Sequence, residues 1–593
     1  MISPVRWRTA IRQIHGQKRQ ILPSLRQAST RPKFTISRPP QLALPKHVNR
    51  QLPAHIQSRF PTKTFITLLV LGGLGWYFIE SVEIVDHWTG HVPHKEPNSM
   101  PVQFHKSRED VEHWLNYHVP DLLSLSRHPQ LHGLRESQFA EEIAHGWMMS
   151  EEDAAEKNMP VTHGAIMDSN RPCEDEFAIG LAPGPGSESW SFWGVYDGHA
   201  GSATSRWLQW TLIPTVSNSL SALHDANNSN TVTNAIMQAF TRLDSEMMTR
   251  AKHAASWYPP AASIALEALD PALSGSCALL ACFDPKASKL RVACTGDSRA
   301  VLGRWDPSSQ SYIAKPLSVD QTGFNPLEVS RLAAEHPNEP DIIDPKSGRL
   351  LGIAVTRAFG DHRWKWDNEF ISSVAAKFWG TAPRPGSKTP PYMTAEPVVT
   401  ETDIISGDDN VNEKPDFMIM ASDGLWDKIS SADAVTLISQ YLTAKASNTI
   451  TPPRTTAEIV GAHHATFGPD GHAPGNVISP SSVKHPDGIT YSVDDGKLQP
   501  VDWRAEPQYF AIEDENAAVC LIRNALGGSR KELLRGVLSV QDTPRSRNVF
   551  DDTTVLVVFF GRGEEGKGRS KGRSKGKMEA GFEGTGKAWW KFW

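Results

Sequence analysis

The sequence predicts an α+β domain built of layers, which spans about residues 160–562 of the 593-residue chain. Two observations carry this prediction. Short apolar runs that end at Gly or at acidic residues indicate strands, and amphipathic stretches between these runs indicate helices. Runs of strands with the helices set apart from them are typical of a domain in which sheets and helices form separate layers.

The predicted strands are apolar runs bounded by turn residues. They cover residues 191–198, 276–284, 290–305, 416–424 and 553–561. The run 290–305 contains a Gly-Asp turn between two apolar halves, which predicts a β-hairpin. The predicted helices cover residues 202–222, 232–252, 326–335, 431–445 and 516–540. Asn325 and Pro326 open the third of these helices, because Pro is favoured at the first helical position.

The N-terminal segment 1–63 is basic and predicts a mitochondrial presequence. Residues 1–79 contain 13 Lys and Arg and no acidic residue, and the first acid is Glu80. An Arg-rich segment without acids is typical of mitochondrial targeting, because a membrane potential that is negative inside draws a cationic leader inward. A disordered basic tail is the alternative that the composition leaves open.

The segment 64–80 predicts one short transmembrane span. Phe65–Ile79 is an uncharged run of 15 residues, which as a helix is shorter than the ~30 Å hydrocarbon core of a bilayer. Lys63 at one end and Trp76 with Tyr77 at the other could anchor this helix at the two interfaces. A buried helix or hairpin is the alternative. After a presequence, such a span predicts anchoring in the inner mitochondrial membrane, on a side that the sequence does not fix.

The composition of the other segments predicts their roles. Residues 81–150 are predicted to form a linker, and stretches rich in Pro, Gly, Ser and Asp predict insertions near 376–415 and 446–509. A basic, low-complexity tail covers residues 563–593. Five cysteines without a C-x-x-C pair exclude a disulfide scaffold and a structural zinc site. Because residues 80–560 carry the acidic excess of a chain with net charge −5, nucleic acid is excluded as the main partner.

Acidic residues lie at the ends of the predicted strands, where a strand holds a side chain in a fixed place. They are Glu174, Asp175, Asp197, Asp423, Asp551 and Asp552. Carboxylates without His or Cys are the ligands that Mg²⁺ and Mn²⁺ prefer. Two such ions about 3.5–4 Å apart can lower the pKa of a bridging water and orient a phosphoryl group for in-line attack. Each Asp before a Gly is, taken alone, more often a turn residue, so only the joint arrangement indicates a metal site.

Around these residues the chain resembles the metal-dependent Ser/Thr protein phosphatases of the protein phosphatase 2C family. The run FWGVYDGHAG at 192–201 is similar to the metal-binding signature of that family. Further similar runs stand in the family's order, at 174–175, 274–281, 294–302, 317–321, 354–361, 420–427 and 550–558. Residues 151–562, which contain these runs, have no G-x-x-x-x-G-K-[ST], H-E-x-x-H or G-x-S-x-G pattern, which excludes those other signatures there.

Within the family, the most similar branch is that of the mitochondrial pyruvate dehydrogenase phosphatases. The similar runs are 331–337, 348–366, 390–400 and 513–528. The resemblance implies a catalytic domain over 151–562 with a four-layer αββα sandwich, in which two antiparallel β-sheets are flanked by helices. It also implies hydrolysis of phosphoserine and phosphothreonine in phosphoproteins, with two or three Mg²⁺ or Mn²⁺ ions and a metal-bridged water as the nucleophile.

The branch implies a mitochondrial enzyme with pyruvate dehydrogenase E1 alpha as its candidate substrate. Other mitochondrial phosphoproteins are the alternative, because a membrane span can place the domain in the intermembrane space. A catalytically inactive, membrane-anchored scaffold of the same fold is a third hypothesis. A structural membrane protein that only binds a partner is a fourth. The intact carboxylates argue against the scaffold, and a purely structural protein leaves the acidic pattern unexplained.

The resemblance assigns roles to the acidic residues. Asp197 is expected to bridge two metal ions, with the carbonyl of Gly198 as a further ligand. Glu174 is expected to bind one ion, and Asp423 and Asp551 are expected to bind the other. All of these groups are hard oxygen donors, as the pattern of carboxylates requires.

The resemblance also assigns a proton donor and a third metal site. His199 is expected to be the general acid that protonates the leaving Ser or Thr alkoxide, a step that contributes about 10²–10⁴-fold. The alternative for His199 is a turn residue that hydrogen-bonds locally. Asp297 and Asp427 match positions that help to hold a third metal in some members of the family. Their alternatives are a hairpin turn and a helix cap.

The chain departs from the family's pattern at two places. Many members have an Arg that binds the substrate phosphate where this chain, like the branch, has Asn170. Asn170 and the adjacent Arg171 are therefore the candidate contacts of the substrate phosphate. The usual Asp-His after the L-S-x run is Asp320-Gln321 here, and this pair is not a core metal ligand. Asp361, which ends the run AVTRAFGD, is expected to be mainly structural.

Overall fold

The computed structural model describes ten segments, all within the compact unit Pro93–Trp593. They are residues 102–118, 144–169, 172–223, 228–378, 380–407, 414–450, 493–494, 497–498, 503–540 and 546–561. The predicted presequence 1–63, the predicted span 64–80 and the basic tail 563–593 lie outside the described residues, as do Asn170 and Arg171. Among the helices that are described, none is both long and apolar enough to cross a membrane.

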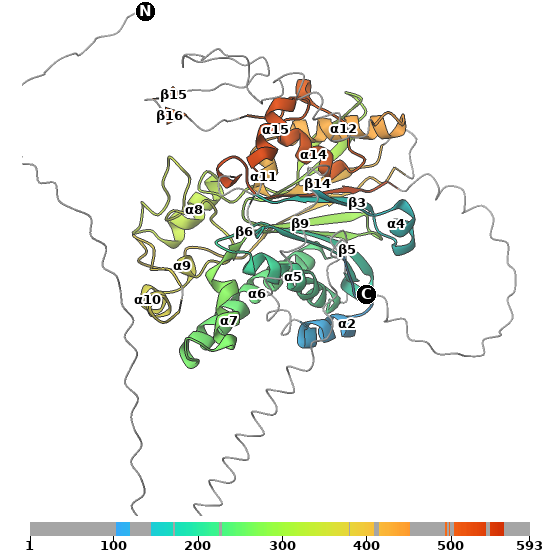
Figure 1. The fold of residues 1–593 in the computed structure, drawn as a ribbon. Coiled ribbons are helices and arrows are strands. Elements are labelled where there is room, and N and C mark those ends of the chain that lie inside the picture. The colour runs from blue at the N-terminus through green and yellow to red at the C-terminus, as the bar shows by residue number, and fades with distance from the viewer. Residues whose placement is uncertain are drawn as a thin grey trace, which may run out of the picture. The chain divides into compact units, whose positions relative to one another are not determined.

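Two six-stranded sheets form the centre of the fold (Figure 1). The first sheet has the order β1-β4-β5-β8-β9-β13, with the bounds Val102–Phe104, Glu176–Pro183, Ser189–Tyr196, Ala278–Asp284, Lys289–Thr295 and Val398–Asp403. The second sheet has the order β11-β10-β14-β17-β3-β2, with the bounds Ser311–Pro316, Arg299–Asp306, Phe417–Ala421, Thr553–Phe559, Val161–Met167 and His145–Met148. Neighbouring strands are antiparallel except β1 and β4, which are parallel.

The two sheets face each other across a shared apolar core. Phe177 and Trp193 of the first sheet belong to the same buried cluster as Met418 of the second. Phe417 and Ile419, on either side of Met418, instead belong to the cluster that contains the outer helices, because successive residues of a strand point to opposite faces. Both faces of the central strands are therefore buried, which explains why the sequence shows continuous apolar runs there.

Helices cover the outer face of each sheet (Figure 1). On the side of the first sheet lie α5, α6 and α7, with the bounds Ala203–Ser221, Ser229–Trp257 and Ser263–Leu273. On the side of the second sheet lie α12, α14 and α15, with the bounds Ser431–Ala446, Ala517–Ala525 and Lys531–Val540. This arrangement confirms the predicted α+β fold, an αββα sandwich of two mostly antiparallel sheets flanked by helices.

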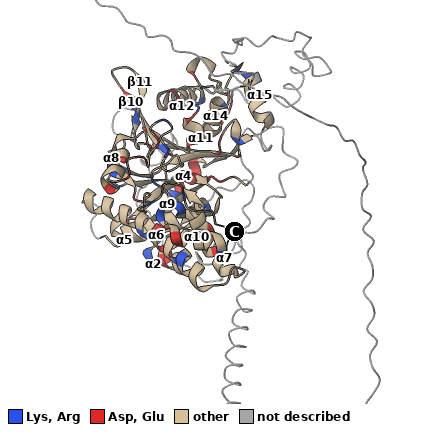
Figure 2. Cartoon of the chain, turned by 90° about the vertical axis from the view of Figure 1, so that its left-hand side faces the viewer, with Lys and Arg blue, Asp and Glu red and all other residues tan. Residues whose placement is uncertain are grey.

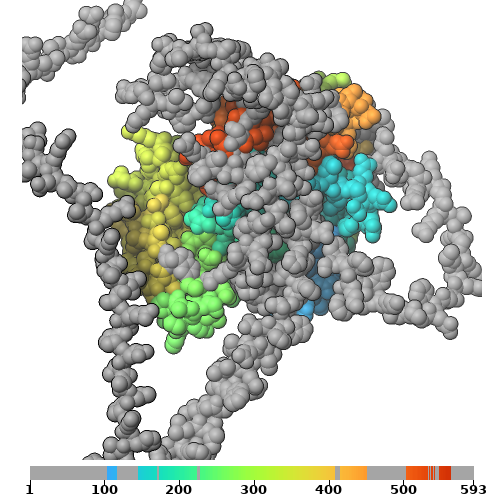
Figure 3. All heavy atoms as spheres, viewed as in Figure 1, coloured from blue at the N-terminus to red at the C-terminus, as the bar shows by residue number. Residues whose placement is uncertain are grey.

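The remaining elements are short. They are α2 (Arg108–His113), α4 (Glu151–Lys157), α8 (Pro326–Glu335), α9 (His362–Lys365), α10 (Asn368–Lys377), α11 (Asp423–Trp426), the strand pair β15 (Val493–Asp494) and β16 (Lys497–Leu498), the π-helical turn Trp114–His118 and the 3₁₀ turns Pro185–Ser187, Pro507–Tyr509 and Ser546–Asn548. Helices α8, α9 and α10 lie together at one end of the sandwich, as the ribbon and the space-filling view both show (Figures 1 and 3).

The predicted helices are largely confirmed, with one difference near the C-terminus. α8 begins at the predicted position, and the side chain of Asn325 accepts a hydrogen bond from Leu327 N at 3.0 Å. The predicted helix 516–540 is instead two helices, α14 and α15, with Gly528 in the left-handed region (φ +61°) between them. Glycine takes this conformation without steric cost, so the chain can turn there and start a second helix.

The predicted hairpin over 290–305 is wrong. Its two halves form β9 and β10, but β9 pairs with β8 and β13 in the first sheet, whereas β10 pairs with β11 and β14 in the second. The turn at Gly296 (φ +108°) therefore passes from one sheet to the other. Because both strands are buried on both faces, their apolar pattern indicates strands but does not identify the strands with which they pair.

Two segments that were predicted to lie outside the layers contribute strands to them. The predicted linker 81–150 supplies β1 to one edge of the first sheet and β2 to one edge of the second. β13, at the other edge of the first sheet, lies within the predicted insertion near 376–415. Edge strands are often short and carry polar side chains, so their composition resembles that of a loop.

Candidate active site

A three-stranded sheet positions the first part of the site. Its order is β12-β7-β6, with the bounds Phe359–Gly360, Gly275–Ser276 and Gly198–His199. His199 pairs with Gly275, and Gly275 pairs with Gly360 on its other side. Asp361 directly follows β12. A Cβ at Gly275 would collide with His199 Nε2 and with Asp361 Oδ2, so the close approach of His199 and Asp361 requires glycine here.

His199 and Asp361 form a hydrogen-bonded pair. His199 Nε2 lies 2.7 Å from Asp361 Oδ2, and the Asp361 side chain is buried. Burial by itself would lower the pKa of His199, but the carboxylate of Asp361, followed by those of Asp297 and Glu174, raises the pKa above its ordinary value. Asp361 is therefore more than the structural residue that the sequence predicted. Because 162 positions separate it from His199, this contact could not be predicted from the sequence.

A cleft of about 550 Å³ brings together five of the predicted site residues. The predicted ligands Asp197, Asp423 and Asp551 line it, together with Asp297 and His199. The first three lie where strands end or begin, after β5, after β14 and before β17. Ends of strands from both sheets therefore meet at this cleft. The acids at strand ends were the signal that predicted this site.

The structure separates the members of the two acidic pairs. Asp552 is buried and accepts a hydrogen bond from Glu174 N at 2.8 Å. Asp175 is also buried and accepts a hydrogen bond from Ser422 Oγ at 2.7 Å. These two carboxylates thus join segments that are far apart in the sequence. Asp551, the predicted ligand of its pair, lines the cleft instead.

Glu174 lies against the turn that carries Asp197 and His199. Gly201 N donates a hydrogen bond to Glu174 Oε1 at 2.8 Å. A Cβ at Gly198 would collide with the carbonyl of Glu174, so this close approach of two backbones also requires glycine. The structure therefore brings Glu174 beside the other predicted ligands, and the ligand role of the Gly198 carbonyl stays a prediction.

Arg547 is a residue of this region that the sequence did not predict. Its Nη1 lies 2.7 Å from Glu174 Oε2, and its Nη2 lies 3.6 Å from Asp551 Oδ1. It also lines the cleft, so its positive charge offsets carboxylates of the cluster. The only signal in the sequence is a basic residue four positions before Asp551, which does not distinguish a site residue from a surface charge.

Cys277 is a second residue that the sequence did not single out. Within the described part of the chain, Asp197, Cys277 and Asp297 each place one ligand atom within 4.8 Å of the other two. Cys277 Sγ donates to Asp297 Oδ1 at 3.3 Å, and Cys277 N donates to the carbonyl of Asp197 at 2.8 Å. Burial, and then the nearby carboxylates, raises the pKa of the Cys277 thiol. The thiol therefore stays protonated and orients Asp297, since hard cations prefer oxygen ligands.

Asp427 lies at the border of the site. It is exposed at the end of α11, and its N–H donates to the carbonyl of Asp423 at 2.8 Å. It does not cap the helix that follows, because the side chain that caps α12 is that of Ser430. The role of Asp297 and Asp427 in holding a third metal stays a prediction.

Gln321, at the second departure from the family's pattern, supports the turn before Asp297. Its buried side chain accepts a hydrogen bond from Gly296 N at 2.7 Å and donates one to the carbonyl of Cys294 at 2.9 Å. The neighbouring Asp320 accepts a hydrogen bond from Arg299 Nε at 2.9 Å. Both side chains thus hold the crossing between the two sheets.

The carboxylates of the cluster disfavour one another's charge. Burial, and then neighbouring carboxylates, raises the pKa values of Asp197 and Asp423 well above the ordinary value. Burial also raises the pKa of Asp551, although Arg547 opposes this rise, and it raises the pKa of Asp297 to about 6. A divalent cation would remove this repulsion, and carboxylate oxygens are the donors that Mg²⁺ and Mn²⁺ prefer. The donor set therefore fits the predicted ions.

The crowded carboxylates predict a pH dependence of stability in chelator-treated protein. Because the pKa of Asp297 is raised from 3.8 to about 6 in the folded state, its contribution to stability is complete below about pH 4 and is lost as the pH rises through about 6. Cations bind the deprotonated carboxylates, so the rise in Tm that Mn²⁺ causes should increase over the same pH range. Thermal unfolding at several pH values, with chelator and with Mn²⁺, measures both trends.

The control for this prediction is Asp297→Asn, which keeps the shape of the side chain and removes its titration. Its chelator-treated form should lose less stability than the wild type between about pH 4 and pH 6. A Mn²⁺-induced rise in Tm that shrinks as the pH increases would contradict the assignment of this cluster to a cation.

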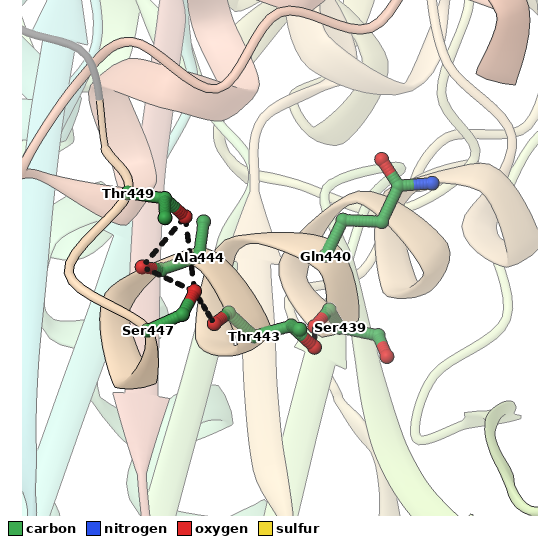
Figure 4. A pocket seen from close by; sticks show the side chains of 6 residues that line it. All are labelled: Ser439, Gln440, Thr443, Ala444, Ser447 and Thr449. Atoms are coloured by element: carbon green, nitrogen blue, oxygen red, sulfur yellow. Dashed lines mark hydrogen bonds between the residues drawn. The ribbon is translucent and has the colours of Figure 1, made fainter.

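A second hollow, of about 270 Å³, lies at the C-terminal end of α12 (Figure 4). It is lined by Ser439, Gln440, Thr443, Ala444, Ser447 and Thr449. Ser447 Oγ donates to the carbonyl of Thr443 at 2.8 Å, and Thr449 Oγ1 donates to that of Ala444 at 3.3 Å. Two of its hydroxyls are thus bound to carbonyls of the same helix, and none of the described residues that line this hollow has an ionisable side chain. The acidic cleft is therefore the better candidate for catalysis.

Comparisons with known proteins identify the family. Residues 147–461 match the sequence model of protein phosphatase 2C. A protein phosphatase 2C homolog from Schizosaccharomyces pombe is 35% identical over 401 residues, which cover 66% of this chain and 78% of that protein. The mitochondrial pyruvate dehydrogenase (acetyl-transferring)-phosphatase 1 of Saccharomyces cerevisiae is 34% identical, with 62% of each protein covered. The crystal structure of serine-threonine phosphatase 2C from Toxoplasma gondii matches with a TM-score of 0.36 and 16% identity, and covers 67% of this chain and 94% of that one.

The extent of these matches differs between the relatives. The chain spans more than two thirds of the S. pombe homolog but less than two thirds of the S. cerevisiae phosphatase. The matched residues 147–461 are more than half of the 593 residues, and they include Asp197, His199 and Asp423 of the cleft. The chain therefore belongs to the protein phosphatase 2C family of protein phosphatases.

Proposed function

We propose that this chain hydrolyses phosphoserine and phosphothreonine in proteins and depends on Mg²⁺ or Mn²⁺. The observation that carries this proposal is the meeting of Asp197, Asp423 and Asp551 in one cleft with the His199–Asp361 pair. Such a site combines ligands for hard cations with a group that can hold a proton for the leaving alkoxide. The family match supports the same chemistry.

The carboxylates supply the cation site in this proposal. Asp197 would serve both ions, with the Gly198 carbonyl as a further ligand; Glu174 would serve one ion, and Asp423 and Asp551 would serve the other. When bound, the two cations supply an activated water and positive charge that stabilises the phosphoryl group during its transfer. The residues of the chain fix the place of this chemistry, because each is held at the end of a strand or beside a required glycine.

His199 holds the proton that the leaving alkoxide needs. Its Nε2 is engaged by Asp361, so Nδ1 is the nitrogen that is left to donate to the substrate oxygen. The carboxylate of Asp361 favours the doubly protonated ring and fixes its orientation. Asp361 is thus a positioning residue in this proposal.

The substrate proposed first is phosphorylated pyruvate dehydrogenase in mitochondria. The mitochondrial pyruvate dehydrogenase phosphatase of S. cerevisiae is 34% identical to this chain, and the basic leader 1–63 is of the kind that directs proteins to mitochondria. Anchoring through residues 64–80 stays a prediction, because that segment lies outside the described residues.

The substrate is tested by comparing two phosphoproteins. The full chain, in detergent, is incubated with phosphorylated pyruvate dehydrogenase E1 alpha and with a generic phosphothreonine peptide, each with Mn²⁺. A kcat/KM that is at least about tenfold higher on pyruvate dehydrogenase is expected, because docking outside the reacting group adds binding energy. Equal values would keep the phosphatase chemistry and remove this substrate. If neither substrate releases phosphate, the hypothesis of a catalytically inactive scaffold is favoured.

A further inference from the structure

Three arginines line the same cleft as the carboxylate cluster. Arg349 lies in the segment between α8 and β12, Arg363 lies on α9, and Arg384 lies in the loop after α10. Figure 2 shows basic positions on α9, at the end of the sandwich where α8, α9 and α10 lie. None of the assigned roles in phosphoester hydrolysis uses these arginines, so their gathering at the cleft requires a separate explanation.

The three guanidinium groups have no carboxylate bound to them in the described part of the chain. Arg363 Nε donates to the carbonyl of Ala382 at 2.8 Å, and Arg349 Nη1 donates to that of Gly352 at 3.2 Å. Arg384 Nε is buried without a hydrogen-bond partner among the described residues. Their nitrogens are thus held by backbone groups at most, which leaves most of their donors available to an anion.

The arginines also act on one another. Burial lowers the pKa of Arg363, and the charge of Arg384 lowers it further. Burial likewise lowers the pKa of Arg384; Asp361 opposes this change, and Arg349 adds to it. Asp361, the nearby acid, is hydrogen-bonded to His199. Three like charges in one wall are costly unless an anion joins them.

The wall that carries the arginines is rigid. The Trp364 ring is buried, and its Nε1 donates to the carbonyl of Leu350 at 3.0 Å. The guanidinium of Arg384 lies 4.6 Å from the centre of this ring, and that of Arg363 lies 5.9 Å from it. A Cβ at Gly352 (φ +94°) would come within 2.8 Å of Arg384 Nη2, so glycine makes room for the guanidinium. The donors are therefore already in place before a ligand arrives.

We propose that Arg349, Arg363 and Arg384 form an anion subsite for a second acidic group of the substrate, next to the phosphorylated residue in the same peptide. This inference rests on the proposed phosphoprotein phosphatase function. Guanidinium groups bind carboxylates and phosphates alike, so the group bound is either an Asp or Glu side chain or a second phosphate. The phosphate that is hydrolysed would instead bind at the carboxylates Asp197, Asp423 and Asp551 of the same cleft.

The test uses the full chain and matched phosphothreonine peptides. The peptides of one set differ at a single position, which carries Asp, Asn or a non-hydrolysable phosphonate analogue of phosphoserine. In successive sets this position is moved to each site near the phosphothreonine. At one position, kcat/KM for the Asp or the phosphonate peptide should exceed that for the Asn peptide by about tenfold or more, mainly through a lower KM. The larger of the two gains identifies the group as a carboxylate or as a phosphate.

Variants assign this preference to the arginines. The preference is the kcat/KM for the peptide with the acidic group divided by the kcat/KM for the Asn peptide. Arg384→Gln and Arg363→Gln should each reduce this ratio towards one. Lys346→Gln, which removes a charge from an exposed side chain in the same segment as Arg349, should leave the ratio unchanged. The ratio compares two substrates of one protein sample, so a partly misfolded variant does not alter it. An undiminished preference in both arginine variants would overturn the subsite.

The failures of the subsite and of the proposed function are distinguishable. Metal-dependent hydrolysis with equal kcat/KM on all peptides would overturn the subsite and leave the phosphatase function standing. Absence of hydrolysis would overturn the phosphatase function. In that case the fluorescence anisotropy of the labelled phosphonate peptide measures its binding to the protein. The Kd should be about tenfold higher for Arg384→Gln than for the wild type. Equal Kd values for variant and wild type would overturn it.

Discussion

Replacing Asp197 by Asn should lower the turnover number on a phosphothreonine peptide by several orders of magnitude while the fold stays intact. Asp197 lies at the end of β5, in the cleft where Asp423 and Asp551 meet it. Asn has the same shape without the charge, so it cannot complete a site for two divalent cations. Because burial and like charges already penalise the ionised form of Asp197, the Tm of the metal-free variant should not fall.

Steady-state kinetics with Mn²⁺ and calorimetric titration of Mn²⁺ binding measure the effect of Asp197→Asn. Asp306→Asn is the matched control, because Asp306 also ends a strand, β10, but bonds to Ser308 and Ser309 in an exposed turn. This control should keep both turnover and affinity for Mn²⁺. Full turnover and full Mn²⁺ affinity in Asp197→Asn would contradict the two-metal assignment.

The second large effect is expected at the His–Asp pair. His199→Ala should lower turnover on a phosphoserine peptide by about 10²–10⁴-fold, because a Ser alkoxide leaves poorly without a proton. The loss on an aryl phosphate should be much smaller, since a phenolate leaves without that help. Asp361→Asn should lower turnover less than His199→Ala, because the ring stays in place but loses the carboxylate that favours its protonated form.

Asp361→Asn is a suitable variant because the backbone at this position has φ +56°. Asn accepts the left-handed conformation better than most residues, so the turn after β12 should keep its shape. Steady-state kinetics on the two substrate classes measure both variants. Equal losses on the aryl phosphate and the phosphoserine peptide would count against His199 as the general acid.

Much of the fold follows from local sequence patterns. α8 begins where Asn325 and Pro326 predict it, and the buried strands coincide with apolar runs. The errors concern pairing and edges. β9 and β10 look like a hairpin because each is locally a strand, yet the choice of partner depends on contacts with β13 and β14, more than 90 residues away in the sequence. β1 was missed because its three residues carry too short a pattern.

The candidate site divides in the same way. Asp197, Asp423 and Asp551 could be predicted because each stands at the end of an apolar run, and the family's motifs added His199. Asp361 was undervalued, since its contact with His199 exists only after β6, β7 and β12 have come together. The same holds for Arg547 and Cys277, whose partners in the cleft come from distant segments. Candidate metal ligands at the ends of strands can therefore be predicted from a sequence. The residues that position them cannot, because their contacts form only in the folded chain.

The central claim is that the carboxylate cluster holds the cations that a phosphoprotein phosphatase requires. Its most direct test is phosphate release from a phosphothreonine peptide by the purified full chain, with Mn²⁺ or Mg²⁺ and again with excess chelator. Release with the cation, loss of release with the chelator and recovery when the cation is restored are the predicted results. Release that continues at the full rate in excess chelator, or no release with either cation, would contradict the claim.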